Sequence, residues 1–169
     1  ARDSRPSTER ALLPSLWRFG NPYSEVPHPG YYVAGRYLQL EQRAAPLIET
    51  PRGADGEVVP AVTATKVWPS AFAMLKFLEA MGGAVEGRRV LDLGSGTGLS
   101  GLSAALLGAR RVALTDLAEN LPLLQRNAAL NGLGGIVDVV ALDWTQPPPP
   151  QLLGGDWTML LAADCVFWE

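Results

Sequence analysis

The stretch Val90-Leu91-Asp92-Leu93-Gly94-Ser95-Gly96-Thr97-Gly98-Leu99 decides how this chain folds. Its apolar beginning predicts a buried strand, and its glycines predict a tight turn that leads directly into a helix. Glycine lets the backbone adopt unusual φ/ψ values and approach a ligand closely. Because the backbone N–H groups at a helix N-terminus have no partner within the helix, this stretch predicts a ligand site where the strand ends.

A carboxylate stands where such a site needs one. Asp116 ends the apolar segment 111–116 and follows Gly94 by about 20 residues, which is the spacing of a ribose-binding acid in dinucleotide-binding folds. A carboxylate at that position can accept hydrogen bonds from both ribose hydroxyls. The two features together predict an adenosine-containing cofactor at the carboxyl end of a parallel sheet.

Strands and helices alternate along the second half of the chain, which predicts an α/β fold with a doubly wound, Rossmann-like sheet. The supply of strands matches only the first four core strands of such a sheet. The expected strands are 89–93, 111–115, 136–142 and 157–163, and the expected helices are 69–81, 98–107 and 121–130.

Local signals refine these elements. Asn120 is expected to cap the helix 121–130, and the four prolines at 147–150 are expected to exclude a crossover helix before the last strand. Tyr31 to Gln42 alternates as a strand with a bend at Gly35, and 44–65 predicts an irregular hairpin.

Three segments follow from this organisation. Residues 1–30 are rich in Pro, Ser and Arg and predict an extended or disordered arm. Residues 31–66 form a strand and hairpin extension, and 67–169 form the cofactor-binding half of an α/β domain.

Composition limits the function classes. The chain has 169 residues, 47% of them hydrophobic, and a net charge of −3. Residues 67–169 hold 6 Lys/Arg and 10 Asp/Glu, hence a net charge of −4, and this acidic balance makes nucleic acid an unlikely direct substrate. No apolar run approaches the ~20 residues that cross a bilayer, so membrane insertion is not expected.

Cysteine and histidine usage points to a reducing compartment. Cys165 and His28 are the only residues of their types, so we expect neither a disulfide framework nor a metal site. An intracellular protein is expected, in the cytoplasm as first choice and in an organelle as the alternative.

The glycine turn has two interpretations. Residues 96–101 match the dinucleotide fingerprint G-x-G-x-x-G, which would indicate a nicotinamide-dependent oxidoreductase. Residues 92–98 match acidic-x-G-x-G-x-G, which resembles motif I of class I methyltransferases that use S-adenosylmethionine. The strand ends by Leu93, and this favours the second frame. Asp92 then stands at the strand end, where it can meet the positively charged amino end of the cofactor.

Further motifs extend this resemblance to one family. In chain order they are Val67-Trp68-Pro69-Ser70-Ala71, the motif I frame, Leu114-Thr115-Asp116-Leu117, Asn127 with Asn131, Leu142-Asp143-Trp144, and Ala162-Ala163-Asp164-Cys165-Val166-Phe167. This series resembles the seven-strand protein-lysine methyltransferases of methyltransferase family 16, over roughly residues 31–169.

The resemblance implies roles for individual residues. Trp68 would line the cofactor pocket, and Gly94, Ser95 and Gly96 would surround the methionine portion. Asp116 would bind the ribose, Trp144 would lie beside the adenine, and Ala163 would stand at the cofactor's edge. Core packing is the alternative for both tryptophans.

The same resemblance implies catalytic positions. Asp164 opens a motif that reads D-x-x-Y in the family and would orient the lysine nitrogen; a helix cap is the alternative for this residue. The final tyrosine is replaced by Phe167, which keeps an aromatic wall without the hydroxyl.

The implied function is methyl transfer from S-adenosylmethionine to a lysine side chain of a protein substrate. The alternative is a catalytically idle, methyltransferase-like structural subunit of a larger protein or ribonucleoprotein assembly. The strand 157–163 would be left with an open apolar edge, so we expect a partner chain or a further segment to cover it.

Overall fold

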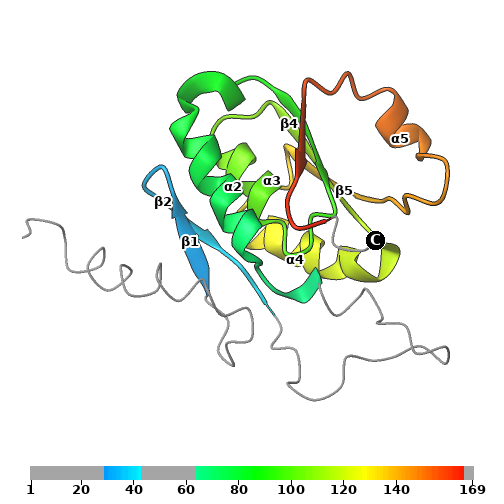
Figure 1. Ribbon diagram of the computed structural model, residues 1–169, viewed down its shortest axis with the longest axis horizontal. Coiled ribbons are helices and arrows are strands. Elements are labelled where there is room, and N and C mark those ends of the chain that lie inside the picture. The colour runs from blue at the N-terminus through cyan, green and yellow to red at the C-terminus, as the bar shows by residue number, and fades with distance from the viewer. Residues whose placement is uncertain (1–28, 43–63, 166–169) are drawn as a thin grey trace, which may run out of the picture.

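The computed structural model describes residues 29–42 and 64–165 (Figure 1). The expectations for the arm 1–30 and for the hairpin 44–65 fall almost entirely outside the described residues. The division of the chain into three segments therefore stays a prediction.

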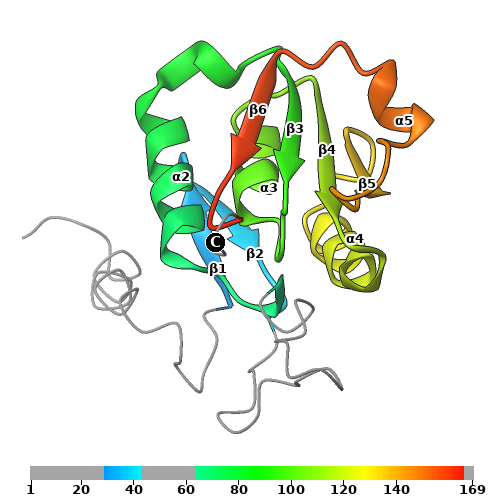
Figure 2. The same cartoon turned by 45° about the vertical axis from the view of Figure 1, so that its right-hand side comes forward.

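A parallel four-stranded sheet forms the centre of the molecule, in the order β5-β4-β3-β6. Figure 2 shows these strands side by side. Their bounds are β3 Arg89–Leu93, β4 Arg111–Asp116, β5 Val137–Ala141 and β6 Met159–Ala162. The predicted strands are confirmed, and β3 lies inside the sheet because it pairs with both β4 and β6.

The three long helices also match their predicted ranges: α2 Pro69–Ala80, α3 Leu99–Leu106 and α4 Leu121–Leu130. Pro69 stands in the first turn of α2, and Gly82, with a φ of 58°, follows its end. Figure 1 shows α2, α3 and α4 on one side of the sheet and the short α5 on the other. This two-sided arrangement is the doubly wound α/β fold expected from the sequence.

Two local expectations were wrong. A short helix, α5 Pro150–Leu153, does form and begins at the last proline of the run, because a proline in the first turn needs no N–H partner and already has a helical φ. Asn120 does precede α4, but its side chain makes no capping hydrogen bond to that helix. It bonds to Asp116 instead.

The segment predicted as one bent strand is a hairpin. β1 Gly30–Val33 pairs antiparallel with β2 Arg36–Gln39. The turn residues Ala34 and Gly35 have φ values of 46° and 80°, as a two-residue hairpin turn of the primed type requires. The turn shifts the phase of the alternation, so the buried residues are Tyr31 and Val33 before it and Leu38 and Leu40 after it. Exposed aromatic residues at Tyr32 and Tyr37 obscured this shift in the sequence.

The hairpin packs on the helices and adds a layer to the fold. Its inner face consists of Tyr31, Val33 and Leu38, which are at most 6% exposed. The Ala34 N–H donates to Glu79 Oε1 of α2 at 2.7 Å. The hairpin therefore belongs to the same core as the domain that carries the sheet.

Strand β6 lies at one end of the sheet. Within residues 29–42 and 64–165, no strand pairs with its outer edge. Leu161 points into the core and is 3% exposed, whereas Leu160 is 63% exposed. The helices in the described part of the chain are all too short or too polar to span a bilayer.

Candidate functional site

A cavity of about 740 Å³ opens at the carboxyl ends of the parallel strands, where ligand sites of open α/β sheets lie. Its wall includes eight of the ten site residues predicted from the sequence. These eight are Trp68, Gly94, Ser95, Gly96, Asp116, Trp144, Ala163 and Asp164. Asp92 is not part of the wall, and Phe167 lies outside the described residues.

The glycine turn forms the floor of the cavity and is tied to β4. Gly94 and Gly96 have φ values of 61° and 54°, in the left-handed region that favours glycine. The Ser95 N–H donates to the Thr115 carbonyl at 2.8 Å. The Ser95 hydroxyl accepts from the Thr115 N–H and donates to the Asp92 carbonyl, each at 3.0 Å. The turn conformation is therefore fixed by its neighbouring strands.

Asp116 joins the turn to the end of β4. Its Oδ2 accepts from the Gly96 N–H at 2.7 Å. Its Oδ1 accepts from the Leu117 N–H at 2.8 Å and from Asn120 Nδ2 at 2.7 Å. Two carboxylate oxygens offer about four acceptor positions, so acceptor capacity remains for a ligand hydroxyl.

Asp92 lies beneath the turn, where it is 1% exposed. Its Oδ2 accepts from the Gly101 N–H of α3 at 3.0 Å. Burial raises the pKa of this carboxyl from 3.8 to about 7, and hydrogen bonds to Ser95 and Gly101 limit the shift. The expectation that Asp92 faces the cofactor's amino end therefore finds no support in the cavity wall. Asp92, the acidic residue of the motif I frame, is buried behind the cavity wall.

The two tryptophans come to the wall from different segments, Trp144 from the loop after β5 and Trp68 from the start of α2. Trp144 is 54% exposed, so core packing does not explain it. Its ring lies over the turn, because a Cβ at Gly94 would stand 3.5 Å from Trp144 Cζ2. Trp68 is half-buried at the N-cap of α2.

The Asp143 carboxylate accepts from the N–H and hydroxyl of Thr145, which lowers the pKa of Asp143.

Asp164 binds the N-terminus of α2. Its Oδ2 accepts from the Ser70 N–H at 2.8 Å, and its Oδ1 accepts from the Ser70 hydroxyl at 2.7 Å. The alternative interpretation of Asp164 as a helix cap thus has a structural counterpart, although the capped helix lies earlier in the chain. Asp164 itself has a φ of 54°, a conformation that Asp tolerates better than most residues.

Several residues of the wall had no assigned role in the sequence. Six of them stand inside the quoted motifs and could have been found there: Ala71, Thr97, Leu117, Leu142, Asp143 and Cys165. The other four, Ala64, Lys66, Asn120 and Thr145, join the wall only through the fold. Burial raises the pKa of the Cys165 thiol, which disfavours the thiolate form.

The charge of the wall favours a cationic ligand. Asp116, Asp143 and Asp164 line the cavity together with one basic side chain, Lys66. Opposite charges attract most strongly where water is partly excluded. Among the described residues, no group of three or more His, Cys, Asp or Glu side chains is arranged to hold a metal ion.

Comparison with known proteins identifies similar sequences. The lysine methyltransferase family model matches residues 57–169. EEF1A lysine methyltransferase 3 of Mus musculus is 35% identical over 63% of this chain and 45% of its own length. The protein N-lysine methyltransferase METTL21A of Danio rerio is 38% identical over 63% of this chain and 49% of its own length. The chain thus spans about half the length of these relatives.

A solved structure is also similar. The protein described as a putative RNA methyltransferase PH1948 from Pyrococcus horikoshii is 32% identical, with a TM-score of 0.38, over 42% of this chain and 36% of that chain. At this score the similarity adds nothing to the assignment, which rests on the family model and the sequence relatives.

Proposed function

This chain belongs to the lysine methyltransferase family, and from that premise we propose that it transfers a methyl group from S-adenosylmethionine to a lysine side chain of a protein. One observation carries the proposal for this chain in particular. The acid expected to bind ribose, Asp116, and the exposed ring of Trp144 belong to the same cavity wall as the glycine turn.

The residues of the wall fit S-adenosylmethionine. The cavity of about 740 Å³ is of the size that encloses a small organic ligand. Asp116 has acceptor capacity left for a ribose hydroxyl, and the Trp144 ring offers a face for a purine. Gly94 and Gly96, both with positive φ, place no side chain at the turn. When bound, S-adenosylmethionine supplies a methyl group that is already activated on a positively charged sulfur.

In this proposal the residues of this chain bind the cofactor and orient the lysine nitrogen. Methyl transfer to an amine needs the neutral nitrogen held in line with the bond that breaks, so positioning supplies most of the rate. Asp164 and the backbone of Ala163 form the wall segment proposed to orient the lysine nitrogen. The ring of Trp68, which lines the same cavity, can stabilise the cation that forms. Asp164 would orient the lysine nitrogen while it accepts hydrogen bonds from Ser70 at the start of α2.

The partners follow from this activity. We propose a protein substrate with an exposed lysine, which the acidic wall would attract, and no direct nucleic-acid substrate. We also propose that a partner chain or a further segment of protein covers the outer edge of β6, where Leu160 is exposed. A reducing, intracellular compartment such as the cytoplasm suits a chain with a single cysteine.

Cofactor binding is tested by isothermal titration with S-adenosylmethionine. Asp116→Ala removes one or two charge-assisted hydrogen bonds of about 1.5–3 kcal/mol each, so we expect at least about tenfold weaker binding. Asp138→Ala, which removes an exposed carboxylate on β5, is the matched control and should bind like the wild type. Equal affinity of Asp116→Ala and wild type would contradict the ribose assignment, and tighter binding of NAD would favour an oxidoreductase.

Substrate class is tested by transfer of a labelled methyl group in a cell lysate. We expect label on protein lysines and its loss in Asp164→Ala. Label confined to RNA or small molecules would overturn the proposal. Tight cofactor binding with no transfer by the purified protein would favour the idle structural subunit.

A further inference from the structure

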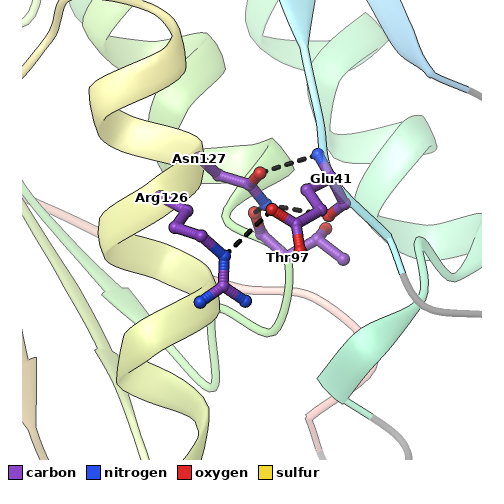
Figure 3. A network of polar contacts seen from close by, with 4 residues as sticks. All are labelled: Glu41, Thr97, Arg126 and Asn127. Atoms are coloured by element: carbon purple, nitrogen blue, oxygen red, sulfur yellow. Dashed lines mark hydrogen bonds and ion pairs between the residues drawn. The ribbon is translucent and has the colours of Figure 1, made fainter.

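We propose that Asn127 is a positioning residue that couples the β1–β2 hairpin to the glycine turn, residues 94–98. Through this coupling, ligand binding in the cavity and docking of the hairpin strengthen each other. The proposal rests on the proposed function for the identity of the ligand. Figure 3 shows the side chains involved, which come from α4, the turn and the segment after β2.

Asn127 lies on α4 and is fully buried, with 0% exposure. Its Nδ2 donates to the Thr97 carbonyl at 2.8 Å and to the Glu41 carbonyl at 3.1 Å. Its Oδ1 accepts from the Glu41 N–H at 2.7 Å. Both amide donors are therefore used, one on the turn and one on the segment that follows the hairpin.

The contact with Glu41 reproduces the pairing of a neighbouring strand. Asn131 makes the same pair of bonds to Gln39, accepting from its N–H at 2.9 Å and donating to its carbonyl at 2.8 Å. Four residues of helix rise about 6 Å, and two residues of strand rise about 6.6 Å. Asn127 on α4 and Asn131 at its C-cap, one turn apart, can therefore pair with alternate residues at the end of β2 and in the segment that follows it.

Asn127 differs from Asn131 in one respect. Asn127 also holds the carbonyl of Thr97, a cavity residue that is 2% exposed and stands between Gly96 and Gly98. Glycine neighbours give the peptide units around Thr97 wide conformational freedom. A fixed Thr97 carbonyl also fixes the orientation of the next N–H, that of Gly98, which donates to the Ser95 carbonyl at 2.7 Å.

This arrangement links two events through one side chain. Docking of the hairpin holds the Asn127 amide in the orientation that the turn needs, and an ordered turn holds the amide in the orientation that Glu41 needs. The Arg126–Glu41 ion pair at 2.9 Å supports the same contact. Such linkage is reciprocal: a ligand that orders the turn must tighten hairpin docking by the same factor by which the docked hairpin improves its affinity.

The first test needs no ligand and compares Asn127→Ala with Asn131→Ala. Asn131→Ala releases Gln39 of β2 and Asn127→Ala releases Glu41 in the segment that follows β2, but only Asn127→Ala also releases the turn. We expect hydrogen exchange at the Gly96 and Gly98 amides to rise roughly tenfold in Asn127→Ala, the factor that corresponds to about 1.4 kcal/mol. In Asn131→Ala these amides should exchange as in the wild type. Equal turn exchange in the two variants would overturn the proposal.

Asn127→Ala leaves buried carbonyls without donors and is the variant more prone to unfolding. Glu41→Pro approaches the same coupling from the other side, because it removes the N–H that donates to Asn127 Oδ1. It also removes the carboxylate that pairs with Arg126, so Glu41→Ala, which removes that carboxylate and keeps the N–H, is its control. Glu41 is not part of the cavity wall, yet we expect faster exchange at Gly98 in Glu41→Pro. Unchanged exchange at Gly98 in folded Glu41→Pro would contradict the coupling.

The second test uses S-adenosylhomocysteine as the probe. In the wild type it should slow exchange of the Glu41 amide, and Asn127→Ala should bind it roughly tenfold more weakly than Asn131→Ala does. Slower exchange confined to the turn would overturn the proposal. If the wild type does not bind the probe, the proposed function fails, and the exchange comparison in the free protein still decides the role of Asn127.

Discussion

The two walls of the cavity differ in how they are held. The turn side, residues 94–98, is bonded to β4 through Ser95, to Asp116 through Gly96, and to α4 through the Thr97 carbonyl. The β6 side, residues 163–165, follows a strand that pairs with one neighbour within the described residues. Asp164 joins this side to the start of α2 through its hydrogen bonds with Ser70.

This difference matches the two tasks proposed for the site, cofactor binding and substrate binding. The wall proposed to hold the cofactor is buried and bonded from several directions, so its geometry exists before any ligand binds. The wall proposed to receive the lysine carries fewer constraints and the exposed Leu160 nearby. A pre-formed cofactor wall lowers the ordering cost of binding, whereas the other wall remains available for a partner. The following predictions test this comparison, beginning with the largest expected effect.

The turn side should impose a pH dependence on stability through Asp92. Its carboxyl titrates at 3.8 when unfolded and at about 7 when folded, so between these values the folded protein holds a proton that the unfolded chain has lost. The free energy of unfolding should therefore fall as pH rises from 4 to 7, by roughly 4 kcal/mol at most. Denaturant titrations across this range measure it.

Asp92→Asn is the matched variant for this prediction. An asparagine keeps an acceptor for the Gly101 N–H and removes the buried charge, so this variant should be the more stable protein at pH 8 and should lack most of the decline. Parallel pH profiles of the variant and the wild type would show that Asp92 does not titrate in this way.

On the β6 side, adjacent leucines should behave differently. Leu161→Ala should lower the free energy of unfolding by about 3 kcal/mol, because a buried side chain is lost and a cavity remains. Leu160→Ala should cost less than about 0.5 kcal/mol, since this side chain is 63% exposed. Chemical denaturation of both variants provides the measurement. A large cost for Leu160→Ala would mean that this edge is covered and the comparison of the two walls breaks down.

The packing beneath the turn should resist even one added methyl group. A Cβ at Gly101 would overlap Leu114 Cδ2 and stand 2.9 Å from Asp92 Oδ2. We therefore expect Gly101→Ala to destabilise the protein by about 2 kcal/mol. Gly134→Ala is the control, because nothing lies within 4 Å of its added methyl. Gly101→Ala should have a lower melting temperature than Gly134→Ala in thermal unfolding. Equal melting temperatures would show that the turn side accommodates an added methyl group as well as an open loop does.

The smallest effect concerns the link between β6 and α2. Ser70→Ala removes the hydroxyl that donates to Asp164 Oδ1 but keeps the backbone bond. The site is exposed, so we expect a loss of only about 0.5–1 kcal/mol in unfolding free energy. Ser70→Thr retains a hydroxyl and should recover it. A loss of several kcal/mol would place the β6 side among the strongly held parts of the molecule.

The sequence by itself determined the order of elements and the position of the glycine turn. Apolar runs of strand length, helical spacing of apolar residues and glycine turns are local properties, and they fixed β3 to β6, α2 to α4 and the placement of Asp116 at the end of β4. Local patterns also explain the limits of this approach. The alternation in 31–42 changes phase at the reversal at Ala34 and Gly35, but exposed aromatic residues at Tyr32 and Tyr37 obscure that change.

Only the tertiary structure decided which polar groups meet. Asn120 bonds to Asp116 instead of capping α4, and Asp164 caps α2 across 94 residues of sequence. Asn127 joins the turn to the hairpin, and Asp92 is buried one layer below the cavity. Each of these outcomes depends on distances between segments that are far apart in the chain. Local periodicity carries no information on such distances. The packing of helices on the sheet sets them and brings these polar groups within hydrogen-bonding distance.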